Sequence, residues 1–522
     1  MIVSKPTARD LLFDNAAAFE SRTALVDSTG EVSYKDLYQL VATFQAHLLE
    51  CRVSPGDRIV LTGRNNAQLV AAILACWRLE CLAIPIDFRM TVGEVANICQ
   101  KVQASVVLAS EVFADIETLE TEIHGKPKDQ VTKFFTLESI AGSAAGSAAG
   151  PAAGPAKDSG AAGKSGEPSS YDFDALVILT SGTTGTPKGA VHTFESLIEN
   201  LRELSHYFRM GDTTRLILPL PVSHIFGLEV LFIVLLYGGT VILCDLDPTS
   251  MVAAINKYKP QILAGVPTIY GALLSAGKER VNLEAAQLLL SGGAPLPISL
   301  ARQFEETFGK RINNGYGSTE SKLICLNIDG PLESIGRPIE SATIRVIDPE
   351  GKELEEGQEG EIYIDCPLVM KGYLGQEEKT REALTPRGYR TGDIGYVRDG
   401  YVFISGRAKE MIIVAGNKVF PSEVEDVLAR HPLVKEVAVT GVDHSRLGQI
   451  VKATIVIGDA NLSEKLDGAQ TKETRESILA NLKSFSKDNL KRELRPMVWD
   501  LRPESQPLPK TRSGKIDKKM IS

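Results

Sequence analysis

Cysteine and histidine are scarce in this sequence, which argues against a disulfide framework and against a structural zinc site. Only 7 of the 522 residues are cysteine and 7 are histidine. The cysteines are scattered, no two of them form a CxxC pair, and several lie in apolar runs such as AAILACW. This pattern indicates buried free thiols in a reducing compartment.

An excess of positive charge is also absent. The formal net charge is -9, so neither nucleic acid nor an anionic membrane surface is expected as the main partner. The N-terminal residues lack the charged start and apolar block of a signal peptide. One long apolar stretch, 228–244, is too short to span a membrane and is interrupted by Gly238 and Gly239. We expect it to form a buried helix, a turn and a buried strand in a cytoplasmic protein without a transmembrane segment.

The first third of the chain alternates between two periodicities. Residues 33–52 and 67–79 have apolar side chains at helical spacing, whereas 57–63 and 81–87 have the pattern of short buried strands. Such alternation predicts a mostly parallel sheet covered by helices, and short apolar strands resume from residue 171. A chain of 522 residues also predicts more than one domain.

Three further segments differ in composition. Residues 141–170 are low complexity, rich in Ala, Gly, Ser and Pro, and predict a flexible insertion. Short strands with Gly-rich turns from about 335 to 405 predict a small antiparallel barrel or sheet. We therefore expect an α/β fold, with mostly parallel sheets and a small β-barrel subdomain in residues 1–405 and a smaller α+β domain in residues 410–522.

The stretch TSGTTGTPKG, 180–189, follows an apolar strand and combines glycines and hydroxyls with one lysine. Backbone N–H groups of such a loop can bind phosphate oxygens. It is not a Walker A motif, because Pro187 precedes Lys188 and Gly189 follows it. Taken alone, the loop fits a plain surface turn equally well.

Ten further motifs accompany this loop in a fixed order, and together they resemble the adenylate-forming superfamily. That superfamily comprises acyl- and aryl-CoA synthetases, peptide-synthetase adenylation domains and firefly-type luciferases, and the resemblance covers residues 10–520. The motifs are TSGTTGTPKG, PVSHIFG, GVPTIY, SGGAPLP, NGYGSTES, IGRP, GEIYI, KGYLG, YRTGDIG, GRAKEMIIVAGNKVFPSEVE and LPKTRSGKI.

The resemblance implies a nucleotide site. The loop would hold the β- and γ-phosphates, Tyr316 would stack on adenine, Asp393 would accept the ribose hydroxyls, and Arg407 would contact the ribose or phosphate region. The implied nucleotide-binding residues are Thr180, Ser181, Gly182, Thr183, Thr184, Gly185, Lys188, Gly292, Gly293, Ala294, Asn314, Gly315, Tyr316, Gly317, Asp393, Arg407 and Lys418. The structural alternatives are a surface turn for the loop, a strand-end turn for 292–294, a core aromatic for Tyr316, a turn residue for Asp393 and a surface ion pair for Arg407.

The resemblance also implies the catalytic residues. Thr319 would contact the α-phosphate, and Glu320 would hold Mg²⁺, a hard cation that prefers carboxylate and phosphate oxygen. Lys515 would bridge the carboxylate and α-phosphate during adenylation. His224 would form a wall where the acid meets the pantetheine channel. The structural alternatives are a solvated carboxylate for Glu320, a solvated lysine for Lys515 and a structural histidine for His224.

The C-terminal domain of this superfamily rotates between the two half-reactions, so a mobile lid is implied here. Residues 406–409 would form the hinge, with Lys409 at the hinge position. After rotation, Val414, Ala415 and Gly416 would border the coenzyme A channel. Surface solvation is the alternative for Lys409 and Lys418.

Two positions bear on the acid. Ile225 stands where amino-acid-specific domains carry an Asp, and Gly315 stands where malonyl-CoA synthetases carry an Arg. Both differences favour a neutral, apolar acid, and a fatty acid fits best, although aryl acids stay open. We expect Ile225, Phe226, Val266 and Gly315 to line the acyl pocket, with Gly292, Gly293 and Gly315 leaving room for the chain. Glu229 could supply a buried carboxylate only if it turned inward.

The sequence therefore predicts an ATP-dependent acid–CoA ligase whose small-molecule partners are a carboxylic acid, ATP and coenzyme A, with Mg²⁺ as cofactor. A homodimer and an acyl carrier protein stay open as partners. Two alternatives remain: an adenylating enzyme that loads a carrier protein, and a non-catalytic nucleotide-binding protein or luciferase-like oxygenase.

Overall fold

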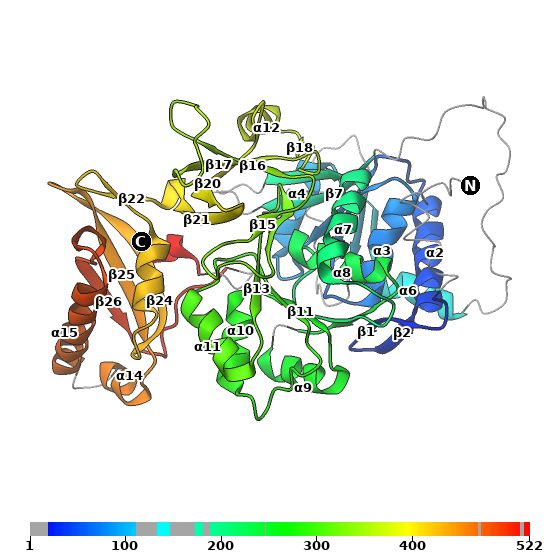
Figure 1. The fold of residues 1–522 in the computed structure, drawn as a ribbon. Helices are drawn as coiled ribbons and strands as arrows, with labels where there is room; N and C mark the ends of the chain where they lie inside the picture. Colours follow the sequence, from blue (N-terminus) through cyan, green and yellow to red (C-terminus); the bar gives the residue numbers. More distant parts are fainter. Residues whose placement is uncertain are drawn as a thin grey trace.

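The computed structural model describes residues 19–110, 119, 133–146, 173–180, 188–245, 247–467, 471–511 and 516–521. A large N-terminal domain lies beside a smaller C-terminal domain (Figure 1). Three predicted features lie outside the described residues: 147–170 of the insertion, 181–185 of the glycine loop, and Lys515. The boundary at 406–409 stays a prediction.

The first large sheet has seven strands in the order β18-β8-β7-β4-β3-β5-β6. Strands β7, β4, β3, β5 and β6 run parallel, while β8 and β18 add an antiparallel edge. Every residue of β4 and β5 is buried, as expected for parallel strands covered on both faces. The bounds are β3 Arg58–Thr62, β4 Leu82–Ile86, β5 Val106–Ala109, β6 Lys133–Thr136, β7 Asp174–Thr180, β8 Lys188–Thr193 and β18 Gly372–Tyr373.

The second large sheet has nine strands in the order β15-β14-β13-β12-β11-β9-β10-β1-β2. Its six central strands are parallel, and antiparallel strands close both edges. The bounds are β1 Thr23–Asp27, β2 Gly30–Ser33, β9 Arg215–Leu218, β10 Thr240–Leu243, β11 Ile262–Gly265, β12 Leu288–Ser291, β13 Ile312–Ser318, β14 Lys322–Asn327 and β15 Arg337–Pro338. The predicted mostly parallel architecture is confirmed.

Helices cover and separate these sheets. Helix α3 contacts β3 and β4 of one sheet and β1 of the other, so it lies between them. Helix α8 is apolar nearly all round and almost wholly buried, followed by a turn at Gly238 with φ +77° and then by β10. This order confirms the helix, turn and strand predicted for 228–244. The bounds are α2 Tyr34–Glu50, α3 Ala67–Arg78, α4 Val92–Val102, α6 Leu137–Gly146, α7 Phe194–Phe208, α8 Ile225–Leu236, α9 Pro248–Tyr258, α10 Pro267–Ala276, α11 Ile298–Phe308 and α12 Glu377–Ala383.

The predicted β-rich subdomain is a five-stranded antiparallel sheet, ordered β16-β17-β20-β19 with β21 also paired to β20. The strand pairs of the described residues form an open path, so of the two expected forms this is a sheet and not a closed barrel. The bounds are β16 Thr343–Ile347, β17 Gly360–Asp365, β19 Leu384–Thr385, β20 Gly388–Arg398 and β21 Tyr401–Arg407.

The C-terminal domain is a second five-stranded sheet, ordered β23-β22-β25-β24 with β26 paired to β25. Helix α15 packs against the same core as α13 and lies on the side of this domain far from the large domain (Figure 1). The two domains touch where the Ser422 hydroxyl donates to the Ser405 carbonyl over 2.8 Å. The bounds are η1 Ala408–Glu410, β22 Ile412–Val414, β23 Asn417–Val419, α13 Pro421–Leu428, β24 Val434–His444, β25 Gly448–Ile457, α14 Ala460–Asp467, α15 Thr471–Asn489, η2 Arg492–Leu494, β26 Val498–Arg502 and η3 Lys518–Met520.

One boundary of the predicted insertion is wrong. Residues 141–146 belong to the end of α6. The buried side chains of Leu137 and Ile140 anchor this helix, and alanine, the best helix former, continues it. The low-complexity composition therefore begins inside a regular element.

The cysteines agree with the sequence analysis: all seven are free thiols, and five are buried while Cys51 and Cys244 are partly exposed. Among the helices that the structure describes, none combines the length and apolar character needed to cross a bilayer.

Candidate active site

Tyr373 joins two of the predicted site residues. Strand β18 pairs with β8 so that Tyr373 lies opposite Ala190. Its hydroxyl donates to Glu320 Oε1 over 2.8 Å, and the Lys188 ammonium lies 4.7 Å from its ring centroid. Burial and then the Glu320 charge raise the pKa of Tyr373 above its ordinary value, so the hydroxyl stays a donor. The Glu320 carboxylate and the Lys188 ammonium thus both contact the buried side chain of Tyr373.

The turn that carries Glu320 is built by its own hydroxyls. It joins β13 to β14, and the Ser318 hydroxyl accepts from the N–H groups of Glu320 (3.2 Å) and Ser321 (3.1 Å). Ser318 N–H donates to the Ser321 hydroxyl over 2.9 Å. A side chain at Gly317 would place its Cβ 1.9 Å from the Lys322 carbonyl oxygen. Glycine is therefore required for the two strands to approach at this turn.

A second cluster forms around Asp393. The Tyr316 hydroxyl donates to Asp393 Oδ2 over 2.6 Å, and Arg407 Nε lies 3.0 Å from Oδ1. Asp393 and Arg407 are paired residues of β20 and β21. Burial raises the pKa of Asp393, and the charge of Arg407 and the Tyr316 hydrogen bond oppose this rise. The carboxylate is thus held in place from both sides.

Tyr389 connects the two clusters. It is buried, and the Ser318 hydroxyl donates to its oxygen over 3.4 Å. Burial raises its pKa most, and the charges of Glu320 and Asp393 both add to the rise. The Glu320 and Asp393 clusters therefore belong to one site at the end of β13, where Asn314, Gly315, Tyr316 and Gly317 also lie.

The loop after β12 carries Gly292, Gly293 and Ala294, and neighbouring side chains lie close to Gly292 and to Gly315 of β13. A Cβ on Gly292 would lie 3.1 Å from the Phe226 ring, and one on Gly315 would lie 3.0 Å from Leu323 and 3.1 Å from Leu290. At these two positions apolar side chains border the glycines, and the room for an acyl chain stays a prediction. Only Gly293, with φ +76°, serves a turn.

The remaining predicted wall residues lie at helix starts. His224 is the N-cap of α8, followed by buried Ile225 and partly buried Phe226, and Val266 is the buried N-cap of α10. Glu229 does turn inward, but its Oε1 accepts from the Leu323 N–H over 3.2 Å. This carboxylate is therefore committed to the protein itself.

The predicted hinge and channel residues lie in the small domain. Lys409 is in η1, and its pKa is lowered by burial and by the charge of Arg407. Val414 ends β22, and Ala415 (φ +49°) and Gly416 (φ +85°) form the exposed tip of its hairpin with β23, where Lys418 lies. Two consecutive positive φ angles are typical of a type I′ turn. Their approach to nucleotide or coenzyme A stays a prediction.

Thr180 ends β7, and its hydroxyl donates to the Lys188 carbonyl over 3.4 Å. Thr319, on the turn, has its carbonyl 2.8 Å from His192 Nε2. The sequence analysis gave no role to His192, Tyr373, Tyr389 or Lys322. Tyr373 and Tyr389 lie inside the quoted motifs KGYLG and YRTGDIG, and Lys322 directly precedes the apolar run LICL, so these three residues left a signal in the sequence.

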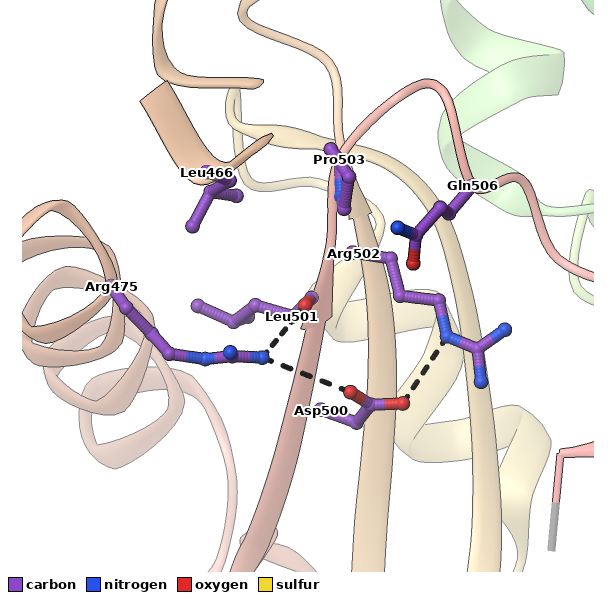
Figure 2. Close-up of a pocket in the computed structure, with 7 residues that line it drawn as sticks. All are labelled: Leu466, Arg475, Asp500, Leu501, Arg502, Pro503 and Gln506. Carbon is purple, nitrogen blue, oxygen red and sulfur yellow. Dashed lines mark hydrogen bonds and ion pairs between the residues drawn. The ribbon is translucent and has the colours of Figure 1, made fainter. Parts of the chain in front are cut away.

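A hollow of about 510 Å³ lies elsewhere, in the C-terminal domain (Figure 2). Both of its arginines turn toward protein groups: Arg475 donates to the Leu501 carbonyl over 2.8 Å, and Arg502 lies 3.2 Å from Asp500. Since none of its residues belongs to the clusters above, we do not include it in the site. It is lined by Leu466, Arg475, Asp500, Leu501, Arg502, Pro503 and Gln506.

Comparison with protein families and curated proteins gives consistent results. The family model described as AMP-binding enzyme matches residues 12–374, and that of the AMP-binding enzyme C-terminal domain matches 423–515. A feruloyl-CoA synthase from Amycolatopsis sp. is 30% identical over 455 residues, or 85% of this chain and 87% of that protein. A long-chain-fatty-acid–CoA ligase from Mycobacterium tuberculosis is 30% identical over 423 residues, or 79% of this chain and 80% of that protein.

Solved structures share the whole fold. ATP-bound MatB from Rhodopseudomonas palustris aligns with a TM-score of 0.82 at 26% identity, covering 98% of this chain and 97% of that one. An o-succinylbenzoate CoA synthetase from Bacillus subtilis, in complex with its acyl-adenylate, aligns with a TM-score of 0.80 at 23% identity, covering 98% of each chain. The latter likeness concerns the fold alone.

Proposed function

The chain belongs to the AMP-binding enzyme family, and from this premise we propose that it joins a carboxylic acid to coenzyme A at the expense of ATP. In the first step a carboxylate oxygen attacks the α-phosphorus and pyrophosphate leaves, giving an acyl-adenylate. In the second step the thiol sulfur attacks the acyl carbon, loses its proton, and AMP leaves. Splitting the reaction in two replaces oxide, a poor leaving group, by AMP. The relatives named as CoA ligases support this reaction class.

The observation that carries the proposal is the meeting of Lys188 and Glu320 on Tyr373. Lys188 presents an ammonium to the phosphates at the end of the glycine loop. Glu320 is a single partly exposed carboxylate with one oxygen held by Tyr373, and Mg²⁺ commonly binds through one or two carboxylates plus substrate phosphates. The donor set therefore fits Mg²⁺, which when bound offsets charge on the phosphates.

The nucleoside would lie against the second cluster. Asp393 is held by Tyr316 and Arg407, so it is oriented before a ribose arrives. A buried, oriented carboxylate accepts hydroxyl hydrogen bonds without reorganising. Lys515 from the C-terminal domain would complete the first step, and rotation about Lys409 would bring Val414, Ala415 and Gly416 beside coenzyme A for the second.

We propose a neutral, apolar acid as substrate and favour a fatty acid. The inward carboxylate of Glu229 is committed to Leu323, which removes the partner that an amino-acid ammonium would need. Phe226, Leu290 and Leu323 fill the space over the glycines with apolar side chains. Because that space is filled, a long chain must either displace Phe226 or enter beside Ile225 and Val266. Aryl acids such as ferulate are the competing class.

Pyrophosphate release across a panel of acids, measured with and without coenzyme A, tests the proposal. We expect release only with acid present, and an acyl-CoA product with fatty acids ahead of aryl acids. Release without any acyl-CoA would favour loading of a carrier protein instead. ATP binding with no release for any acid would contradict ligase activity.

The variant Lys515→Ala tests the two-step scheme. Loss of a transition-state contact costs on the order of 10²–10³-fold in rate, so acid-dependent release should fall by that factor. Conversion of supplied acyl-adenylate to acyl-CoA should persist, because another face of the domain serves that step. Equal loss of both activities would contradict the scheme.

A further inference from the structure

Three titratable side chains lie deep beneath the Thr319–Glu320 turn, and the proposed reaction uses none of them. His192, Lys322 and Glu229 have exposed fractions of 0%, 1% and 2%. Groups of this kind are rarely buried without a specific partner, because their charged forms lose hydration. Their contacts therefore need an explanation.

Lys322 occupies a position that normally suits glycine. It is the first residue of β14, directly after the three-residue connection from β13, where it pairs with Ser318, and its φ is +63°. In such hairpins the left-handed residue is usually glycine, because a Cβ is strained there. A lysine that is both strained and buried indicates that its ammonium is needed.

The ammonium determines the direction of the hydrogen bonds around it. Lys322 Nζ donates to the Leu368 carbonyl, lies 3.4 Å from the Ser196 hydroxyl, and lies 3.3 Å from His192 Nδ1. An ammonium has three donors and no acceptor, so Nδ1 must accept. The ring proton then lies on Nε2, which donates to the Thr319 carbonyl over 2.8 Å.

His192 lies on the same strand, β8, as Lys188, the lysine predicted to contact the phosphates. Lys188 and His192 are four residues apart on β8, so both point to the same face of the strand. That face meets the β13–β14 turn of the other large sheet. Glu229, from α8, is a buried carboxyl whose Oε1 accepts from the N–H of Leu323, the residue next to Lys322.

We propose that Lys322 and His192 are positioning residues for the Thr319–Glu320 turn. The ammonium fixes the histidine as the Nε2–H form, the ring holds the Thr319 carbonyl, and the held turn keeps the Glu320 carboxylate in place for the metal and phosphates. The assignment of Glu320 to the metal rests on the proposed function, whereas the tautomer and hydrogen bond do not.

The first test compares His192→Leu with His192→Gln. Leucine removes the donor to Thr319, while glutamine keeps an N–H donor on a flexible side chain. We expect Leu to raise the Mg²⁺ concentration for half-maximal ATP binding, measured by calorimetry, by about 10- to 100-fold, and Gln to restore part of it. His431→Leu is a matched control, because His431 is also buried and lies 3.0 Å from Asn481 Oδ1 in the other domain. It should leave the Mg²⁺ dependence unchanged.

The second test observes the tautomer directly with ¹⁵N-labelled histidine, the His192 signal being assigned by its loss in His192→Gln. We expect the Nε2–H form in the wild-type protein. Lys322→Met alone would remove the positive charge that acts on the buried Glu229 carboxyl, so the double variant Lys322→Met with Glu229→Gln is used. It should lose the single tautomer while remaining folded.

An Nδ1–H form in the wild type, or a His192→Leu variant with the wild-type Mg²⁺ dependence, would overturn the proposal. Failure of the proposed function would give a different result: the wild-type protein would release no pyrophosphate from ATP with any acid, while the His192 tautomer could still be determined.

Discussion

Replacing Tyr373 by Phe removes one hydroxyl from the centre of the site and leaves the ring beneath Lys188. The lost contact is the 2.8 Å hydrogen bond to Glu320 Oε1. Hydrogen bonds to charged groups contribute about 1.5–3 kcal/mol, and about 1.4 kcal/mol corresponds to a factor of ten. Because Glu320 is partly exposed, water will replace part of this bond. We therefore expect the lower part of the range, a rise of roughly 10-fold in the Mg²⁺ concentration for half-maximal rate.

The assay is acid-dependent pyrophosphate release titrated with Mg²⁺ at saturating ATP. Tyr237→Phe is the matched control, because it removes a hydroxyl that donates to Ser205 over an equal 2.8 Å, away from the site. Its Mg²⁺ curve should coincide with that of the wild type. A Tyr373→Phe curve that also coincides, or an equal shift in both variants, would refute the assignment of Glu320 to the metal.

Three further changes are predicted. Gly336→Ala should lower the unfolding free energy by more than about 3 kcal/mol, because φ is +91° and the new Cβ would lie 1.9 Å from the Leu326 carbonyl oxygen. Gly56→Ala, with φ +83° and no atom within 4 Å of the new Cβ, should lower it by only about 1–2 kcal/mol. Equal losses of unfolding free energy in urea would contradict this prediction. Burial raises the pKa of Asp426 to about 6, so the folded state binds the proton more tightly than the unfolded state (pKa about 3.9) and stability falls as pH rises from about 4 to 6. Replacing this residue by Asn should therefore stabilise the fold about 1 kcal/mol more at pH 8 than at pH 5, and a gain that is the same at both would be inconsistent. Asp393→Asn should weaken ATP binding by about 10- to 100-fold in calorimetry, since an oriented charged acceptor is lost, and unchanged affinity would exclude it from the nucleotide site.

The fold was predictable where local pattern and tertiary setting agree. The unbroken apolar run of α8, the turn at Gly238 and the short strand β10 followed directly from residues 228–244. The end of α6 was not predictable, because low-complexity Ala-rich sequence is compatible with both coil and helix. Two buried side chains upstream, Leu137 and Ile140, decide between them.

The site was predictable only in part. Motif spacing named Tyr316, Asp393, Arg407 and Glu320, and the structure brings the first three into direct contact. Motif spacing could not reveal the hydrogen bond from Tyr373 to Glu320, because Tyr373 is positioned by the pairing of β18 with β8, which joins residues nearly two hundred positions apart.

The packing of side chains around the glycines also could not be predicted from the sequence. Glycines at 292 and 315 suggest space in a sequence, yet Phe226 and Leu323 occupy that space. Which neighbour fills a gap depends on packing between strands and helices that are distant in the chain. The side chains that border Gly292 and Gly315 therefore could not be identified from the glycines alone.

Isotope transfer tests the proposed chemistry most directly. The acid is supplied with ¹⁸O in both carboxylate positions, together with ATP, Mg²⁺ and coenzyme A. The masses of the products are then measured by mass spectrometry. Because a carboxylate oxygen bonds to the α-phosphorus and stays there when the thiol displaces AMP, we expect one ¹⁸O atom in AMP, one in acyl-CoA and none in pyrophosphate. Unlabelled AMP, or label in phosphate or pyrophosphate, would contradict an acyl-adenylate at this site.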